Sequence, residues 1–514
     1  MILVFDLPLT KTWQLDELDA GAKRLLVQVE ELKNSQQPIQ RLPPDVIVET
    51  ATYLVPKACG GDCQPLIAMS QVCRYWRVAL TSNPESWCFF KSEYMDLVPL
   101  FLERSGSYPL EIDLSDAWFY PVVQHIRPHV NRLTILKCHV GEVNDSFLRT
   151  LSQLNSYPNL HTFSIISTGA LTADPESIET ALVPGNMPNL RTLELLPLPV
   201  SPHFVQFKHL VDLRIKVAYS TLTSVLDLLA ANPSLEKVRL IGGFEDYNDA
   251  RAAESITLGR LRFLSMERCT PRKFLEKLTF PREARIFIRY NFTSHLTPPQ
   301  FTLPRSMGKF GLTSLHALMA FTNDTYIDAT GPNGSVAIRF VELRSASPVC
   351  NAIASLSTAG VTRLVCEFHP TLDVESLDRV IKMMGVLPHL EEIELVHFSG
   401  ENVQDFLFAL KDISKWTKLL RLKFVHCRQL INWSVDLSSM ACGRKVEGLT
   451  FDTVTIVYKR GERVLHDALM RLEWAVGMLG LVEEEVGEVM RSEVEWDDTS
   501  CTTRIASVSA GQLM

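Results

Sequence analysis

The sequence has no run of 18 or more uncharged apolar residues, so we expect no membrane-spanning helix. Its N-terminal apolar run, Ile2 to Phe5, is too short for a secretory signal and is interrupted by Asp6. The 11 cysteines are odd in number and spread over 514 residues, which is not the paired framework of a small secreted domain. We therefore expect an intracellular protein, cytoplasmic and/or nuclear.

A surplus of positive charge is also missing. Lys and Arg total 51 and Asp and Glu total 59, which gives a formal net charge of −8. Residues 483–498 hold eight carboxylates and one arginine, and this segment therefore accounts for −7 of the net charge. The rest of the chain is near −1, which gives no broad basic surface for phosphates. Nucleic acid is therefore excluded as the expected partner. The length favours about three domains or one long repeat array.

Motifs for phosphate binding, metalloprotease chemistry, nucleophilic serine catalysis and dinucleotide binding are all absent. Cys59 and Cys63 have no second ligand pair at zinc-site spacing, and Pro128 interrupts the helix that would align His125 with His129. We predict no catalytic residues, no metal and no cofactor. An enzyme with a site outside these motifs remains an alternative.

The N-terminal segment, residues 1–38, contains a short heptad pattern. Its apolar residues alternate in steps of three and four: Leu15, Leu18, Ala22, Leu25, Val29 and Leu32. This spacing predicts one helix with an apolar seam. Because it covers fewer than three heptads, we expect the helix to pack against its own domain. A coiled-coil homodimer is the alternative.

A pair of amphipathic helices is predicted in residues 39–90. The first opens at Leu42-Pro43, carries Asp45 in its first turn and repeats apolar residues at Ile47, Ala51 and Leu54. The second begins at Pro65 and ends before Pro84. It places on one face Met69, Val72, Cys73, Trp76 and Leu80, with Trp87 following as an apolar anchor.

This order and spacing resembles the F-box over residues 42–87. The second helix carries the segment that contributes most to the resemblance, Ser70-Gln71-Val72-Cys73-Arg74-Tyr75-Trp76-Arg77, and the loop at 55–64 is longer than in that family. The resemblance implies binding to the Skp-type adaptor of an SCF-type, cullin-RING ubiquitin ligase. The implied adaptor-binding residues are Leu42, Pro43, Asp45, Val46, Ile47, Leu54, Leu66, Val72, Cys73, Trp76 and Trp87. So short a segment cannot bury all its apolar surface alone.

Residues 91–460 contain an internal repeat. The pattern apolar-x-x-apolar-x-apolar begins at Val130, Leu160, Leu190, Leu210, Leu235, Leu261, Val361, Leu390, Leu419 and Val446. Its period is close to that of leucine-rich repeats, and the pattern resembles that family. In four repeats a proline stands two positions before the repeat start, at positions 158, 188, 233 and 388. In three repeats a cysteine stands eight positions after the repeat start, at positions 138, 269 and 427. We predict an α/β solenoid of alternating strands and helices.

The repeat fades at about 284–358, where residues 326–330 and 335–341 predict a β-hairpin around Gly331 to Gly334. Residues 461–492 are predicted to form a capping helix, and 493–514 a disordered acidic tail. On a concave strand face we expect, pointing outward, Glu194, Arg214, Arg239, Ser265, Val365, Glu394 and Lys423. Their mixed signs suit a polypeptide target better than a polyanion.

These features together predict a non-catalytic substrate-recognition subunit of a cullin-RING ubiquitin ligase. The F-box-like helices would bind the adaptor and the repeats a target protein. The alternative is an interaction scaffold, in which the helix pair only caps the repeats and the heptad helix drives self-association.

Overall fold

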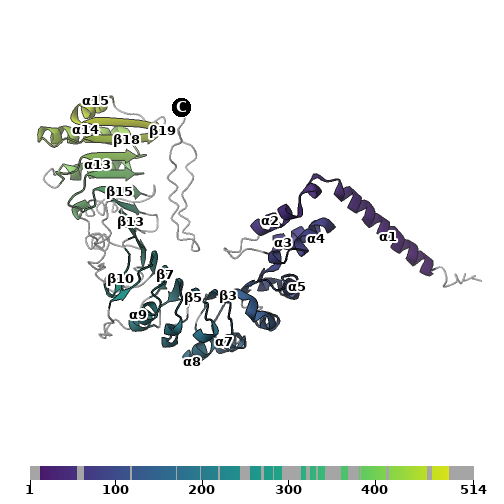
Figure 1. The fold of residues 1–514 in the computed structure, drawn as a ribbon. Coiled ribbons are helices and arrows are strands. Elements are labelled where there is room, and N and C mark those ends of the chain that lie inside the picture. Colours follow the sequence, from purple (N-terminus) through teal and green to yellow (C-terminus); the bar gives the residue numbers. More distant parts are fainter. Residues whose placement is uncertain are drawn as a thin grey trace, which may run out of the picture. The chain divides into compact units, whose positions relative to one another are not determined.

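The computed structural model divides into two compact units, residues 1–190 and 191–514, and each is described by itself (Figure 1). The structure describes residues 12–54, 63–115, 119–154, 156–169, 171–196, 198, 200–217, 220–242, 255–267, 271–281, 283–291, 314–319, 325–331, 334–341, 360–368, 381, 384–411, 416–459 and 466–484.

The first unit begins with helices. The long helix α1 spans Thr12–Ser35, as the heptad pattern predicts, and the short turn η2 spans Pro38–Arg41. Helix α2 is Pro44–Leu54. Pro44 suits the first position because it has no N–H to leave unpaired, and the helix dipole favours the Asp45 carboxylate in the first turn. Ile47 and Ala51 point into the core.

The prediction of one continuous second helix is wrong. It consists of α3, Gln64–Val72, and α4, Arg74–Thr81, separated by Cys73 in an extended conformation. The Cys73 sulfur caps α4 by accepting a hydrogen bond from the Trp76 N–H at 3.5 Å. This break changes the helix phase, so Val72 does not share the buried face of Trp76 and Leu80 and is exposed instead.

The core beneath these helices is built on Trp87, in the turn η4, Pro84–Trp87. Trp87 is 1% exposed, and its indole N–H donates to the Leu80 carbonyl at 2.9 Å. Phe101 packs edge-on at 5.2 Å, and the Arg104 guanidinium lies 4.2 Å from the ring centroid. Trp87 therefore joins α4 to the following α-helix, α5, Val98–Arg104.

A parallel sheet follows in the same unit. Its strands are β1, Phe89–Lys91; β2, Leu110–Ser115; β3, Leu133–Val140; and β4, Thr162–Ser167. Between them lie η5, Ser92–Leu97; α5; α6, Phe119–Ile126; η7, Arg127–Arg132; and α7, Asp145–Ser152. After β4 come α8, Pro175–Ala181, and η8, Pro184–Asn186. Each connection returns the chain to begin a strand in the same direction.

The second unit is a longer sheet. Its strands pair in the order β5, Thr192–Leu196; β6, Asp212–Lys216; β7, Lys237–Ile241; β9, Phe263–Glu267; β11, Arg285–Asn291; β14, Gly334–Val341; β13, Thr325–Gly331; β12, Ser314–Met319; β15, Arg363–Phe368; β16, Glu392–Val396; β17, Arg421–Val425; β18, Thr453–Lys459; and β19, Met478–Glu484. The small strands β8, Ile256–Thr257, and β10, Leu278–Thr279, pair separately.

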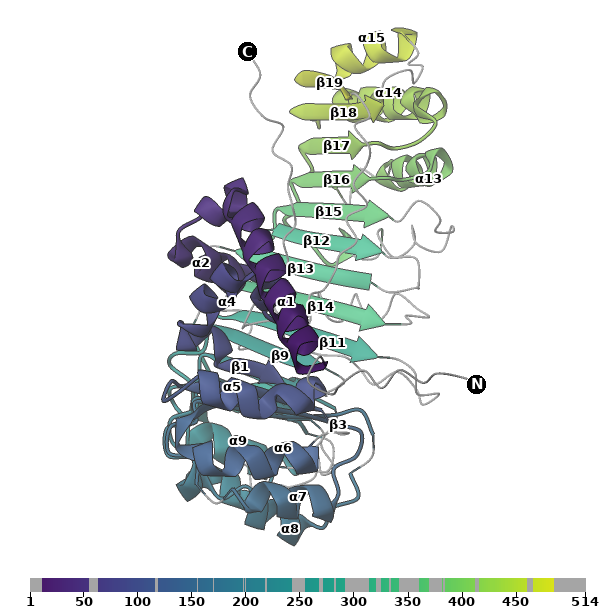
Figure 2. The same cartoon turned by 90° about the vertical axis from the view of Figure 1, so that its right-hand side faces the viewer.

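Helices lie beside these strands. They are α9, Leu222–Ala230; α10, Pro271–Glu276; α13, Gly400–Leu410; α14, Leu430–Val446; and α15, His466–Ala475, and η9 is Pro202–Gln206. Figure 2 shows α13 and α14 next to the stacked strands β16 to β18. The mixed α/β fold, with a large and mostly parallel sheet and helices beside it, is therefore as the repeat predicts.

The strands follow the repeat phase at most starts. From Leu390, for example, Ile393 and Leu395 are the buried pair of β16, and from Leu419 the pair is Leu422 and Phe424. Two starts are wrong, those at Val130 and Val446. In β3 the buried pair that aligns with Phe163 and Ile165 of β4 is Leu136 and Cys138, so this coil starts at Leu133. Val446 ends α14 and is exposed, whereas the buried pair of β18, Val454 and Ile456, follows Phe451.

The hairpin expected near residues 326–341 is present. Strands β13 and β14 pair antiparallel, and because Gly331 pairs with Gly334, the strands extend further into the connection than predicted. The repeat does not stop here, however. Strand β11 continues the parallel series from β9, and β14 and β12 join the hairpin to β11 and β15.

The predicted C-terminal helix is wrong beyond Ala475. Helix α15 ends there and the chain enters strand β19, which pairs with β18. The apolar spacing of Val476, Leu479 and Val482 suits either structure over so short a run, and pairing with β18 decides it. Residues 485–514, with the predicted tail, and 55–62, with Cys59, lie outside the described residues.

Across the described segments, no helix combines the length and apolar character needed to cross a bilayer.

Replacing Trp87 with alanine should locally destabilise the helical part by about 3–5 kcal/mol, because a large ring, its hydrogen bond and its contact with Phe101 are lost together. Hydrogen exchange should accelerate in α4 and α5. The matched change Trp474→Ala, at an exposed ring, should cost about 1 kcal/mol or less. Equal exchange in wild type and Trp87→Ala would contradict the anchoring role.

Candidate functional site

The residues implied by the F-box resemblance fall into two groups. Exposed ones are Pro43, Asp45, Val46, Leu54 and Val72, while Leu42 and Cys73 are partly buried. Val46 lies on the outer side of α2, within its first turn. These side chains are available to a partner without any unfolding of the helices.

The other four residues are in the protein's own core. Ile47, Leu66, Trp76 and Trp87 are all less than one tenth exposed. Helix α2 packs on α4, and α4 packs on η4, so these side chains fill the spaces between elements. Their role is to hold α2, α3 and α4 in place, and little of their surface is accessible to a partner.

Sequence reasoning missed three exposed apolar residues on the same helices. Tyr53 is 78% exposed, and Tyr75 and Val78 on α4 are also exposed. The signal for Tyr53 was available, because it stands seven residues after Val46 and therefore shares the outer side of α2. Tyr75 also ties the helices together, since its hydroxyl donates to the Leu42 carbonyl at 2.8 Å.

The second candidate surface is the central row of the long sheet. Strand register aligns Glu194, Arg214, Arg239 and Ser265, and likewise Val365, Glu394 and Lys423. The two runs connect through the middle strands, where Phe287, Ala337, Asp328 and His316 occupy the same row. All seven predicted strand-face positions therefore occupy one line across the strands.

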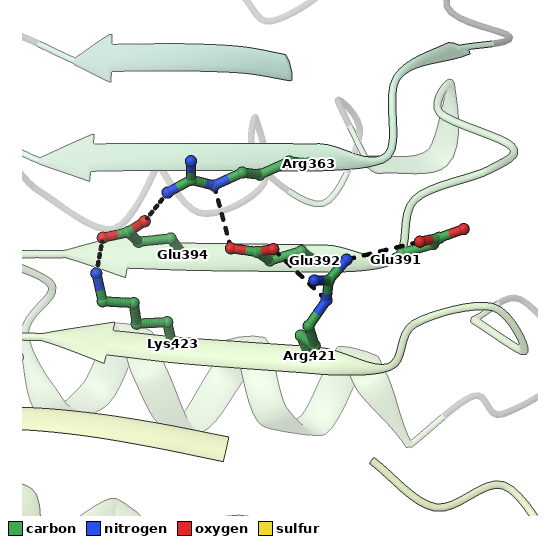
Figure 3. Close-up of polar contacts among 6 residues, drawn as sticks. All are labelled: Arg363, Glu391, Glu392, Glu394, Arg421 and Lys423. Carbon is green, nitrogen blue, oxygen red and sulfur yellow. Dashed lines mark hydrogen bonds and ion pairs between the residues drawn. The ribbon is translucent and has the colours of Figure 1, made fainter. Parts of the chain in front are cut away.

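Glu394 is at the centre of an ion-pair network on β15, β16 and β17 (Figure 3). One of its carboxylate oxygens accepts from Arg363 at 2.7 Å and the other pairs with Lys423 at 2.9 Å. Arg363 also pairs with Glu392 at 3.1 Å, and Arg421 bridges Glu392 at 3.5 Å and Glu391 at 3.6 Å. The three carboxylates and three cations in this network balance in charge.

Two smaller clusters lie on the earlier strands. Glu267 pairs with Arg239 at 2.7 Å and with Arg289 at 3.7 Å. Arg214 lies 3.5 Å from Asp212 and 3.8 Å from Glu194. The charges of both signs that the sequence predicts on this face are thus largely paired with one another within the sheet.

The pKa of Glu394 reflects its surroundings. Burial on its own raises the pKa, but hydrogen bonds from Lys423 and Arg363 outweigh it and hold the pKa below its ordinary value. At Asp212 the balance is reversed, because burial raises the pKa by more than Arg214 and Lys237 lower it. The Glu394 carboxylate therefore stays ionised at neutral pH.

Within the described residues, no cluster of three or more His, Cys, Asp or Glu side chains could hold a metal ion. The repeat cysteines Cys138 and Cys427 are buried, as is Cys366, and burial raises the pKa of the Cys138 and Cys366 thiols. These two thiols are therefore protonated packing groups. Cys269 lies outside the described residues.

Replacing Glu394 with glutamine should lower the free energy of unfolding by about 1 kcal/mol at pH 7, since its cationic partners are half-exposed and can regain water. Because the folded-state pKa is depressed, the stabilisation is complete above the unfolded value of about 4.3 and is lost as pH falls through the folded value. Urea unfolding of both proteins should converge in that acid range. The control Glu391→Gln, at a more exposed pair, should change little at any pH; a Glu394→Gln difference that persists in acid would contradict the ion-pair explanation.

Comparisons with known proteins were made with family models, curated proteins and solved structures. No family model matches the chain, and no curated protein matches it. Among solved structures, the chain is similar to the leucine-rich repeat-containing protein LegL7 from Legionella pneumophila, with 11% sequence identity and a TM-score of 0.22, over 68% of this chain and 91% of that one.

Proposed function

We propose that this chain is a non-catalytic substrate-recognition subunit of a cullin-RING ubiquitin ligase. In this proposal, helices α2, α3 and α4 bind a Skp-type adaptor, and the central row of the long sheet binds a target polypeptide. The observation that carries it is the presence, in one chain, of a small helical segment with exposed apolar side chains and a long repeat sheet.

The adaptor side is supported by Val46, Tyr53 and Val72, which are large apolar residues exposed on short helices whose cores are already filled. Exposed apolar side chains gain most when a partner removes them from water, and aromatic residues such as tyrosine are enriched at interfaces. The buried Ile47 and Trp76 beneath them give this surface a firm base.

The target side is supported by the paired charges around Glu394. A polypeptide with charges of both signs can replace Arg363 or Lys423 as partner of a carboxylate and retain the pairing, whereas a polyanion cannot. The chain would then act by position alone. Holding a target lysine near the ubiquitin-carrying enzyme makes the transfer effectively intramolecular.

The double variant Val46→Asp, Tyr53→Asp should weaken adaptor binding at least tenfold, or by about 1.4 kcal/mol, because it places charge in an apolar interface. Calorimetry with purified full-length chain and a Skp-type adaptor measures this. Since both side chains are exposed, the fold should be retained.

The matched control is Val446→Asp, at a valine that is even more exposed but lies in the second unit. It should bind the adaptor like wild type. Absence of binding by the wild-type chain, or equal binding by the double variant, would contradict the proposal.

The alternative is a protein-interaction scaffold that uses the same strand face without an adaptor. Proximity labelling in cells separates the two. Under the ligase proposal, ubiquitylation of labelled targets should fall in the Val46→Asp, Tyr53→Asp variant while labelling persists. Under the scaffold alternative, ubiquitylation should be the same in both.

A further inference from the structure

Helix α1 does not pack its apolar seam against its own domain, contrary to the expectation from its length. Leu18 is 70% exposed and Leu25 63%, and Ala22, Val29 and Leu32 are exposed as well. Such a row of aliphatic side chains on one helix is costly to leave in water. The seam therefore requires a covering partner.

The opposite side of α1 is the one that meets its own domain. Val27, Glu30, Glu31 and Asn34 line a pocket of about 590 Å³ together with Arg74, Arg77, Val78 and Thr81 of α4 and Arg104 of α5. Arg74 pairs there with Glu31 at 3.4 Å. At about 100° per residue, the centre of this lining lies roughly 180° around the helix from the seam. The contacts within the first unit thus leave the seam turned away from α4.

We propose that α1 pairs through this seam with α1 of a second copy of the chain, in antiparallel orientation. Leu18 would then lie near Val29 of the second copy, and Ala22 near its Leu25. Every seam residue meets a seam residue in this register, because the six positions are symmetric about the middle of the helix.

The charges beside the seam favour this orientation. One flank carries Asp19, Leu26 and Lys33, and the other Gln14, Gly21 and Gln28. In a parallel pair, opposite flanks face each other, so both charged residues face glutamine. In an antiparallel pair, like flanks face each other in reverse, and Asp19 of one copy approaches Lys33 of the other at two equivalent places.

The existing contacts of α1 are compatible with such a pair. Asp19 now pairs with Lys23 at 2.7 Å in an exposed position, where exchange for another cation costs little. Exposed Leu26 lies at the middle of the charged flank and adds apolar area where the two copies meet. The pairing involves neither the outer side of α2 nor the long sheet, so it is independent of the proposed adaptor and target binding.

Analytical ultracentrifugation of the full-length chain, without adaptor, tests the pairing. Wild type should approach twice the monomer mass as concentration rises, and Leu25→Asp should remain at monomer mass. The control Arg24→Asp introduces the same side chain at the neighbouring position, away from the seam, and should still dimerise. A wild-type chain that stays monomeric, or dimerisation that survives Leu25→Asp, overturns the proposal.

Charge exchange tests the orientation without touching the seam. Asp19→Lys and Lys33→Asp should each weaken the dimer several-fold, and the double variant should restore wild-type association. Failure of the restoration overturns the antiparallel arrangement.

Binding of a monomeric wild-type chain to phosphatidylcholine vesicles would assign the seam to a lipid surface instead. Leu25→Asp should still bind a Skp-type adaptor, so failure of the dimer and failure of the ligase proposal are separable.

Discussion

In-register pairing of parallel strands is the constraint on which the second unit depends. A single strand and its helix cannot bury their apolar residues alone, so each coil needs the next one. From β15 to β18 the buried pair moves from strand to strand without a shift: Leu364 and Cys366, Ile393 and Leu395, Leu422 and Phe424, Val454 and Ile456. The antiparallel strand β13 enters the sheet without breaking this order, because β14 and β12 on either side of it restore the parallel direction toward β11 and β15.

The same register arranges the polar side chains. Residues at equivalent positions on neighbouring strands lie side by side, so carboxylates and cations one coil apart in sequence become ion-pair partners, as Glu394 does with Arg363 and Lys423. A row that reads as a mixed-charge binding surface along the chain is, in the folded sheet, a set of ion-paired clusters. Under the proposed function, selectivity for a target would depend on exchange of ion-pair partners and on shape, more than on net attraction.

In the helices of the first unit, one set of side chains forms the core and another set is exposed to solvent. Trp87, Trp76, Leu66 and Ile47 make the core, and Val46, Tyr53 and Val72 remain outside. The change of phase at Cys73 produces part of this separation, because it takes Val72 off the buried face that a continuous helix would have given it. Helix α1 makes the same distinction between its two sides, with Glu31 facing Arg74 and the leucine seam facing outward.

The local pattern of the sequence by itself determined the helix α1, the proline-led start of α2 to within two residues, the strand positions after most repeat starts and the hairpin of β13 and β14. These depend on residue spacing, proline geometry and turn residues, which act over a few neighbours. Only the tertiary structure decided that residues 478–484 form a strand, that β18 follows Phe451 instead of Val446, and which F-box-like residues are buried. The reason is physical: a short apolar run fits a helix or a strand equally well, and the choice is made by a neighbouring strand edge or a core cavity supplied by residues far away in the chain.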